Sequence, residues 1–339
     1  MPLELVHALD GAAGRVIAVG PHGSTTPAAA LRKLGVAGVV MGECEEIVAR
    51  IAGGAWDGLP GLAHWDGSQV RVNGGPQASR FVDAAPLDWP AEWVGRHHHH
   101  HHRFDAPPLG PGAEIEASRG CPYSCTFCAK ENYRDRYRRR DHGAVLAEAA
   151  RLQEHGAEYV YFIDEIFLPN RPLLEGLVGR GLKFGVQTRI DLWKSDMLEL
   201  LGRAGCVSIE AGVESLTQTG RDFLAKNCKL TTEELADRLL VAKRHVPFVQ
   251  ANLLEMEQDD ADLVDRWRGR LREGGVWAND PVPLFPYPGS PDYRRLWGLP
   301  DDTAWERAVD YYLTTFMDLS ELQEARPRRL ADLETGVRA

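Results

Sequence analysis

Segments that predict strands and segments that predict helices alternate over most of this chain, and that order restricts the fold more than any other feature. Runs such as "EYVYFID" at 158–164 and "KFGVQTRI" at 183–190 are rich in β-branched and aromatic residues, which is typical of buried strands. We expect six strands in the second part of the chain, at 114–119, 158–164, 183–190, 206–213, 247–255 and 280–287. We expect helices at about 143–155, 171–180, 195–203, 231–245 and 260–273. This order predicts a parallel barrel or a partial (β/α)6 barrel.

The amino-terminal part of the chain has the same alternation on a smaller scale. "RVIAVG" at 15–20 and "AGVVMG" at 37–42 predict parallel strands, each followed by a helix, and "PHGSTTP" after the first strand predicts a loop. "GLAHWDGSQVRVNGG" at 61–75 predicts a hairpin that turns at Asp66 and Gly67. Two β/α units and a hairpin predict a partial Rossmann-like α/β domain.

Changes in composition divide the chain into four regions. Residues 1–83 form the expected α/β domain. Residues 84–113 are rich in Pro, Gly and Trp and contain six consecutive histidines, His97–His102, which predicts a linker. The barrel is expected over 114–295, and 296–339 predicts a helical extension packed outside it. The histidine run is interpreted as a tolerated expansion of the linker, with a metal-binding tract or a purification tag as alternatives.

Charge and composition exclude several classes of partner. The formal net charge of −10 does not favour a nucleic-acid partner, although "KENYRDRYRRR" at 130–140 is locally basic. No stretch approaches 18 apolar residues, so no membrane partner is expected, and the first residues lack the basic region of a signal peptide. Six cysteines in 339 residues, three of them clustered, favour a reducing cytoplasm over a secreted disulfide scaffold.

The clustered cysteines lie in "RGCPYSCTFCAK" at 119–130. Cys121, Cys125 and Cys128 directly follow the first expected barrel strand, and barrel enzymes carry their active sites at the carboxyl ends of the strands. A structural zinc site uses four ligands and a disulfide uses two. Three thiolates on one loop therefore leave one ligand position of a metal site open. The other three cysteines have no partner at a comparable spacing and are interpreted as ordinary thiols.

This C-x3-C-x2-C loop after a barrel strand resembles the radical SAM superfamily. The resemblance implies that the three cysteines hold three irons of a [4Fe–4S] cluster and that the fourth iron binds S-adenosylmethionine (SAM) through its amino and carboxylate groups. Thiolates are the expected ligands of iron–sulfur clusters. The resemblance also implies reductive cleavage of SAM to methionine and a 5′-deoxyadenosyl radical, with electrons from a flavodoxin or a ferredoxin.

The same resemblance suggests which residues contact SAM. Phe127 matches the aromatic residue that packs near the adenine, and Asp164 or Glu165 would stabilise the amine of the methionine part. The candidates for the remaining contacts are Arg189, Glu210, Glu214 and Ser215. An alternative exists for each, because acidic residues at strand ends often cap helices and Arg189 could pair with Asp164 or Glu214.

"PYPGS" at 286–290 and the preceding α/β domain resemble the subgroup of radical SAM proteins with a cobalamin (B12)-binding domain. This resemblance implies cobalamin contacts on the loops after the first two strands, at Gly20, His22, Ser24, Thr25, Gly42 and Glu43. The chain departs from the subgroup because it lacks the earlier β/α units of the domain, and a D-x-H-x-x-G motif is absent. We therefore expect this chain to bind cobalamin weakly or not at all.

These observations predict an enzyme that starts radical chemistry on a small molecule or natural product that the sequence does not identify. A cobalamin-dependent C-methyltransferase is the first interpretation, and a cobalamin-independent oxidation, rearrangement or methylthiolation is the alternative. The alternative from a different functional class is a module that has no catalytic activity. It would either carry electrons or bind zinc through the three cysteines and a histidine of His97–His102.

Overall fold

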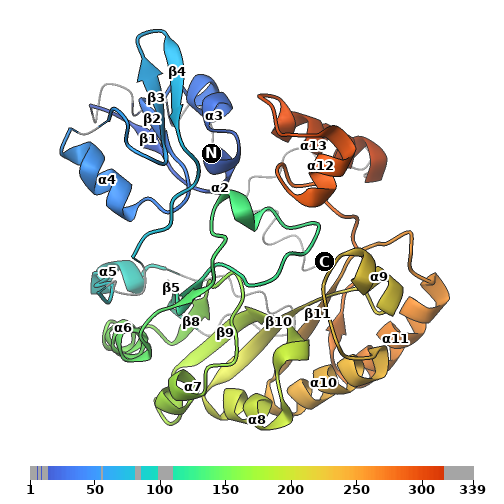
Figure 1. The fold of residues 1–339 in the computed structure, drawn as a ribbon. Coiled ribbons are helices and arrows are strands. Elements are labelled where there is room, and N and C mark those ends of the chain that lie inside the picture. Colours follow the sequence, from blue (N-terminus) through green and yellow to red (C-terminus); the bar gives the residue numbers. More distant parts are fainter. Residues whose placement is uncertain are drawn as a thin grey trace.

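The computed structural model describes residues 14–54, 56–80, 85–97 and 110–316, together with Val6 and Leu9. Two larger sheets organise these residues, and a third sheet has only two strands (Figure 1). A four-stranded sheet in the order β1-β2-β3-β4 belongs to the amino-terminal part, and a six-stranded sheet in the order β12-β11-β10-β9-β8-β5 belongs to the second part. The expected class, an α/β fold with a partial barrel after a smaller Rossmann-like domain, is confirmed.

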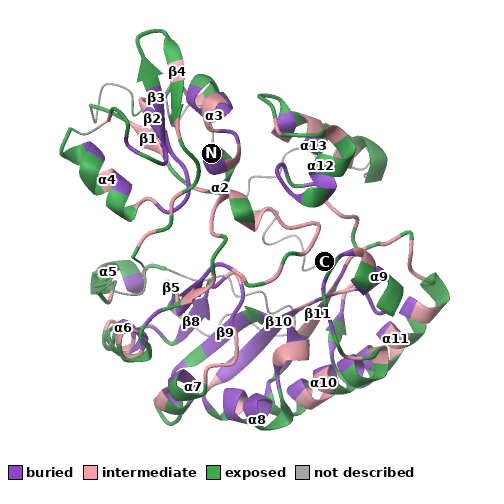
Figure 2. Cartoon of the chain, viewed as in Figure 1, coloured by how far each residue is buried: buried purple, intermediate pink, exposed green. Residues whose placement is uncertain are grey.

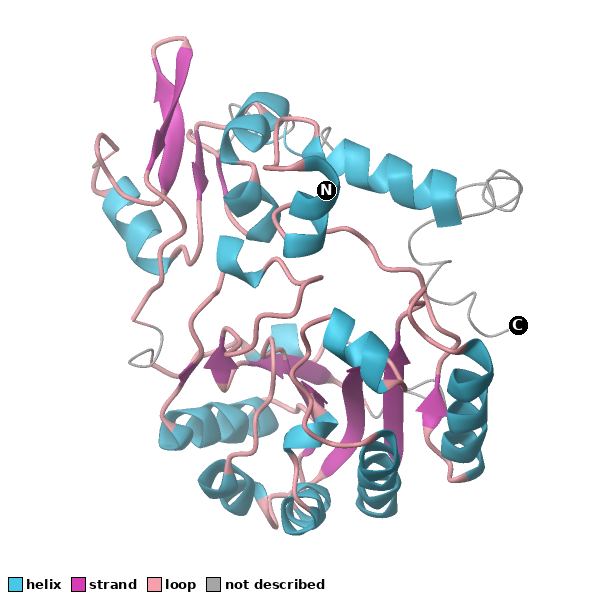
Figure 3. Cartoon of the chain, turned by 45° about the vertical axis from the view of Figure 1, so that its right-hand side comes forward, coloured by secondary structure: helices cyan, strands magenta, loops and turns pink. Residues whose placement is uncertain are grey.

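All neighbouring strands of the larger sheet run parallel. The strands are β5 (Gly112–Ile115), β8 (Tyr159–Phe162), β9 (Lys183–Thr188), β10 (Cys206–Glu214), β11 (Phe248–Leu253) and β12 (Trp277–Ala278). The covering helices are α6 (His142–Glu154), α7 (Arg171–Leu177), α8 (Ser195–Arg203), α10 (Thr232–His245) and α11 (Ala261–Glu273). Figure 3 shows these helices on the outer face of the sheet. Parallel strands need crossover connections, and the chain uses helices for them.

The core lies between the barrel strands and these helices, where strand and helix residues are buried in the same layer (Figure 2). Phe162 of β8 contacts Phe184 of β9 edge to face, and Trp193 is fully buried. The opposite face of the strands is more polar, because Tyr161 and Glu210 lie on it and are joined by a hydrogen bond of 3.1 Å. One face of the sheet thus carries the apolar packing, and the other is available for polar side chains.

The expected sixth strand at 280–287 is wrong in position. The strand is β12 at Trp277–Ala278, and only Val282 forms an isolated bridge, with Leu254. Four prolines between 281 and 288 remove backbone N–H donors, so this segment cannot continue a ladder. The first expected strand is also divided, because β5 ends at Ile115 and Ser118–Arg119 forms β6 of a separate two-stranded sheet.

The smaller sheet consists of β1 (Ile17–Ala18), β2 (Gly38–Val40), β3 (Leu62–Asp66) and β4 (Gln69–Asn73). Its helices are α2 (Pro21–Thr25), α3 (Pro27–Leu34) and α4 (Glu45–Ala52). The β1–β2 pair is parallel and the hairpin β3–β4 is antiparallel, as expected. The hairpin turns at Gly67 and Ser68, one residue later than predicted, and α2 replaces the loop expected for "PHGSTTP".

The carboxyl-terminal helices α12 (Pro291–Trp297) and α13 (Ala304–Phe316) lie outside the barrel, beside the α/β domain in Figure 1. Two ion pairs, Arg32–Asp302 and Lys33–Glu306, join α3 to this region. The chain therefore returns to its amino-terminal domain after completing the barrel. Among the described residues, no helix has the length and apolar character that a membrane-spanning segment needs.

Candidate active site

The three clustered cysteines lie on a loop whose two ends are joined by a short two-stranded sheet, which we call the neck. β6 (Ser118–Arg119) pairs antiparallel with β7 (Arg138–Arg139), and residues 120–137 form the loop between them. Gly120 begins the loop at φ +76°, and a Cβ atom added there would overlap the carbonyl oxygen of Arg136. Only glycine fits this position without a shift of the backbone. The neck holds the two ends of the cysteine loop together.

The three thiols line one cavity at the carboxyl ends of the barrel strands. Cys121, Cys125 and Cys128 are partly buried, and none of the six cysteines forms a disulfide. The other lining residues are Tyr123, Phe127, Lys130, Glu165, Ile166, Gln187, Thr188, Arg189, Gly212, Glu214 and Lys226. They come from the cysteine loop and from the ends of β8, β9 and β10, except Lys226, which follows α9. The structure thus brings the cysteines together with four of the predicted SAM residues: Phe127, Glu165, Arg189 and Glu214.

Burial raises the pKa of each of the three thiols. Nearby cations oppose this effect, since the charges of Lys226 and Arg189 act on Cys125. Within the described ranges, no three His, Cys, Asp or Glu side chains gather closely enough to hold one metal ion. A [4Fe–4S] cluster spreads its thiolate ligands over different irons, so its ligands need only face the same cavity. Binding of a cluster would have to displace the thiol protons.

Arg189 at the end of β9 is buried and held from two sides. Its Nε and Nη2 donate to the two carboxylate oxygens of Asp191 at 3.1 and 2.8 Å, and its guanidinium lies 4.0 Å from the ring centre of Tyr123. The alternative interpretation, in which Arg189 pairs with Asp164 or Glu214, is therefore wrong, because Arg189 pairs with Asp191 instead. Its Nη1 is buried without a hydrogen-bond partner among the described residues. An unmet cationic donor beside the cavity fits an anionic group such as the carboxylate of SAM.

The two acidic residues after β8 face different surroundings. Glu165 lines the cavity, accepts a hydrogen bond from the Gly120 N–H at 2.8 Å and pairs with Arg134 at 3.0 Å. Asp164 is buried and accepts hydrogen bonds from the Ala117 N–H and the Ser118 hydroxyl. Burial raises the pKa of Asp164 to about 7, although both hydrogen bonds oppose the shift. Of Asp164 and Glu165, only Glu165 is placed to contact a cation in the cavity.

Glu214 ends β10 in an uncommon backbone conformation. Its φ is +65°, which few non-glycine residues adopt, and it follows a register shift between β10 and β11. The side chain pairs with the buried Lys226 at 2.6 Å. Such conformations are held in place only by surrounding contacts and are frequent at functional sites. Phe127, the residue before the third cysteine, lines the same cavity with an apolar ring.

Glu210 and Ser215, the other two predicted SAM residues on β10 and just after it, are not among the residues that line the cavity. Glu210 accepts the hydrogen bond from Tyr161 deeper in the barrel. Ser215 is buried and donates to Asp259 at 2.8 Å, while it accepts from the Thr217 N–H at 2.9 Å. These contacts hold the turn before α9 (Gln218–Phe223), whose N-cap is Thr217 with a side chain that accepts from the Gly220 N–H.

The residues predicted to contact cobalamin lie close together, and several of their side chains already contact other residues of the protein. Ser24 donates to the carbonyl of Gly20 at 2.8 Å and accepts from the Gly42 N–H at 2.8 Å. Thr25 donates to a backbone carbonyl of its own helix. The ring of His22 stacks on Trp305 of α13 with centroids 4.2 Å apart.

Glu43, the last of these candidates, extends to the barrel and pairs with Arg119 and Arg138. With Ser24, His22 and Glu43 all engaged, these loops do not present the predicted side chains to a corrin.

The zinc alternative required a histidine near the cysteines. His97 lies at the other end of the barrel, because its Nδ1 is 2.7 Å from the carbonyl oxygen of Gly112, the first residue of β5. The cysteine loop follows the last residues of that strand. His98–His102 lie outside the described residues. The described part of the histidine run therefore contributes nothing to the cysteine cavity.

Several cavity residues were missed by sequence reasoning. Gln187 lies two positions before Arg189, and Gly212 two before Glu214, so the period of a strand could have found both. Lys226 and Tyr123 had no such signal. Lys226 reaches the cavity from the segment after α9, through its ion pair with Glu214.

The sequence of the barrel matches a known family. Residues 115–265 match the model of the Radical SAM superfamily. Over 224 residues the chain is 30% identical to the anaerobic magnesium-protoporphyrin IX monomethyl ester cyclase of Cereibacter sphaeroides, a match that covers 60% of this chain and 35% of that protein. Over 111 residues it is 33% identical to the bacteriochlorophyllide d C-12(1)-methyltransferase of Chlorobaculum tepidum, with 30% and 24% covered. The match spans about a third of the length of the first of these relatives.

Two solved structures share the fold across both domains. TsrM from Kitasatospora setae, a radical SAM methyltransferase solved with cobalamin and a [4Fe-4S] cluster, matches with a TM-score of 0.64 at 18% identity, over 86% of this chain and 61% of that chain. The cobalamin-dependent enzyme OxsB, solved with aqua-cobalamin, matches with a TM-score of 0.64 at 14% identity, over 98% and 59%. Residues 115–265 of the chain thus match the Radical SAM superfamily, and the chain shares the fold of these two solved structures.

Proposed function

We propose that this protein is an enzyme that binds a [4Fe–4S] cluster through Cys121, Cys125 and Cys128 and cleaves SAM reductively. The observation that carries the proposal is the cavity in which these three thiols meet the ends of β8, β9 and β10. When bound, the cluster would supply the electron for cleavage, and the resulting 5′-deoxyadenosyl radical would remove a hydrogen atom from the substrate.

The residues around the cavity have separate tasks in this proposal. Glu165 would accept hydrogen bonds from the SAM amine, and the unmet Nη1 of Arg189 would donate to its carboxylate. Phe127 would pack against the adenine. Glu214 and Lys226 would close the side of the cavity at the end of β10. The roles of Asp164, Glu210 and Ser215 in SAM binding stay predictions, and their contacts support structural roles instead.

Two reactions are proposed for the radical. The names of the methyltransferase relatives support a cobalamin-dependent C-methyl transfer. The engaged side chains of Ser24, His22 and Glu43 support the alternative, a cobalamin-independent oxidation, rearrangement or methylthiolation. The substrate is proposed to be a small molecule or natural product, in keeping with the tryptophan bound in a TsrM structure. A flavodoxin or a ferredoxin in the cytoplasm would supply electrons.

The test is anaerobic reconstitution with iron and sulfide, followed by dithionite and SAM. The proposal predicts a brown protein that releases 5′-deoxyadenosine. The triple variant Cys121→Ala, Cys125→Ala, Cys128→Ala should neither bind the cluster nor release 5′-deoxyadenosine. Full iron binding by the triple variant would overturn the assignment. A colourless wild-type protein with one zinc would favour the non-catalytic module.

A further inference from the structure

The neck of the cysteine loop places two arginines directly opposite each other. Arg119 of β6 and Arg138 of β7 are partners in the register of this two-stranded sheet. Like charges in directly opposite positions destabilise a strand pair. Both guanidiniums donate to the same carboxylate, that of Glu43, with Arg119 Nη1 at 3.0 Å and Arg138 Nη2 on the other oxygen. One carboxylate thus bridges the two strands that close the loop.

This carboxylate comes from the other domain. Glu43 lies between β2 and α4, and its side chain is completely buried. The hydroxyl and the backbone N–H of Ser79 donate to its Oε2 at 2.6 and 3.2 Å. These hydrogen bonds and the two arginines lower the pKa of Glu43 to about 2 against the opposing effect of burial. A carboxylate buried at this depth is retained only with such partners, and removing one member of a buried pair is costly.

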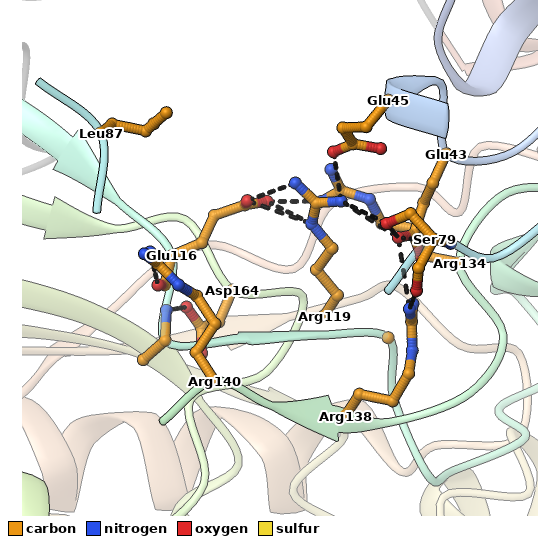
Figure 4. Close-up of polar contacts among 12 residues, drawn as sticks. Glu43, Glu45, Ser79, Leu87, Glu116, Arg119, Arg134, Arg138, Arg140 and Asp164 are labelled. Carbon is orange, nitrogen blue, oxygen red and sulfur yellow. Dashed lines mark hydrogen bonds and ion pairs between the residues drawn. The ribbon is translucent and has the colours of Figure 1, made fainter. Parts of the chain in front are cut away.

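The polar contacts continue from the neck toward the cavity, and Figure 4 shows the contacts of Glu43, Arg119 and Glu116. Arg119 also pairs with Glu116 at 2.8 Å, Glu116 pairs with Arg134 at 2.9 Å, and Arg134 pairs with Glu165 at 3.0 Å. The charges alternate along this path from the α/β domain to the wall of the cavity. Glu165 in turn accepts from the N–H of Gly120, the residue before the first cysteine. The path and the cysteine loop therefore meet at the same carboxylate.

We propose that Glu43 is a positioning residue that fastens the neck of the cysteine loop to the α/β domain and, through Arg119, Glu116 and Arg134, holds Glu165 in place for SAM. The part that concerns SAM rests on the function proposed above. The part that concerns the loop does not, because it follows from contacts of the protein alone. The α/β domain thereby acts as a support for the cysteine loop, and Glu43 is committed to the barrel rather than to a corrin.

The first test uses the metal-free protein and hydrogen exchange of backbone amides. Glu43→Gln keeps the size of the side chain and removes its charge. We expect the amides of 120–137 to exchange about tenfold faster or more, while amides of β2 and β3 stay protected. The matched control is Glu46→Gln in the neighbouring helix α4, whose carboxylate accepts from the Arg80 N–H and from no other group of the described residues. Unchanged exchange of 120–137 in Glu43→Gln would overturn the proposal.

A second variant covers the case in which Glu43→Gln loosens β2 and β3 as well. Arg138→Gln removes the contact of Glu43 with β7, together with the hydrogen bond from Arg138 to the Ser79 carbonyl, and changes no residue of the α/β domain. Faster exchange at 120–137 alone supports the proposal, and unchanged exchange overturns it. If the wild-type protein fails to bind a cluster, the proposed function fails while this test still stands.

The link to Glu165 needs the reconstituted protein. With cluster content and fold retained, Glu43→Gln should raise the Kd for SAM about tenfold and Glu46→Gln should not change it. Faster exchange of the loop with an unchanged Kd would overturn the link from Glu43 to Glu165, and it would leave the support of the loop in place.

Discussion

Glu165 and Asp164 are neighbours in the sequence, but only Glu165 lines the cavity. We expect Glu165→Gln to raise the Kd for SAM about 10- to 100-fold, because a charge-assisted contact with an ammonium group is lost. Asp164→Asn should change this Kd far less, since its side chain faces the Ala117 N–H and the Ser118 hydroxyl. Anaerobic equilibrium dialysis against labelled SAM measures both variants. Weaker binding only in Asp164→Asn would return the role to Asp164.

Asp164 makes the stability of the protein depend on pH. Its folded pKa is raised from the usual 3.8 to about 7, so the folded state holds this proton more tightly than the unfolded state does. Its contribution is fully present below about pH 4 and is lost as the pH rises through 7, at up to about 1.4 kcal/mol per pH unit. Asn can accept from the Ala117 N–H without titrating. Chemical unfolding of Asp164→Asn between pH 4 and 7 should therefore lack this slope, and an unchanged slope would contradict the assignment.

At the scale of elements, the turn at Gly120 closes the loop that carries the cysteines. Gly120→Ala would introduce a side chain at φ +76° and against Arg136. We therefore expect the loop to lose about 2 kcal/mol or more of stability, and the reconstituted protein to lose most of its iron. Gly54→Ala is the matched control, with φ +87° and open space around the added atom. Iron content after reconstitution measures the effect. Equal iron in both variants would contradict the role of the turn.

The elements of the barrel could largely be predicted, because hydrophobic period and helix boundaries are local properties. β8 to β11 and their helices lie close to the expected ranges. The sixth strand was misplaced because "DPVPLFPY" has the apolar residues of a strand while its prolines prevent pairing. Of the residues that line the cavity, the cysteines were predicted from their spacing after the first expected strand, and Phe127, Glu165, Arg189 and Glu214 from the resemblance to the radical SAM superfamily. The contact between Glu43 and Arg119 spans 76 positions and has no local signal.

At the scale of the whole molecule, the two domains and the carboxyl-terminal helices are joined by side chains that were expected to contact cobalamin. His22 stacks on Trp305, and Glu43 pairs with the barrel. We therefore expect little cobalamin to co-elute with this chain after anaerobic equilibration with hydroxocobalamin and gel filtration. TsrM from Kitasatospora setae, solved with cobalamin, serves as the positive control. Stoichiometric corrinoid on this chain would contradict the prediction and favour the methyltransferase.

The central claim is that three cysteines hold a cluster whose remaining iron is open to SAM. The most direct measurement is the electron paramagnetic resonance spectrum of the reconstituted, dithionite-reduced protein, recorded with and without SAM. The account predicts the signal of a reduced [4Fe–4S] cluster that changes when SAM is added, and its loss in Cys125→Ala. A signal that SAM leaves unchanged, or a wild-type protein that contains a single zinc and gives no signal, would contradict it.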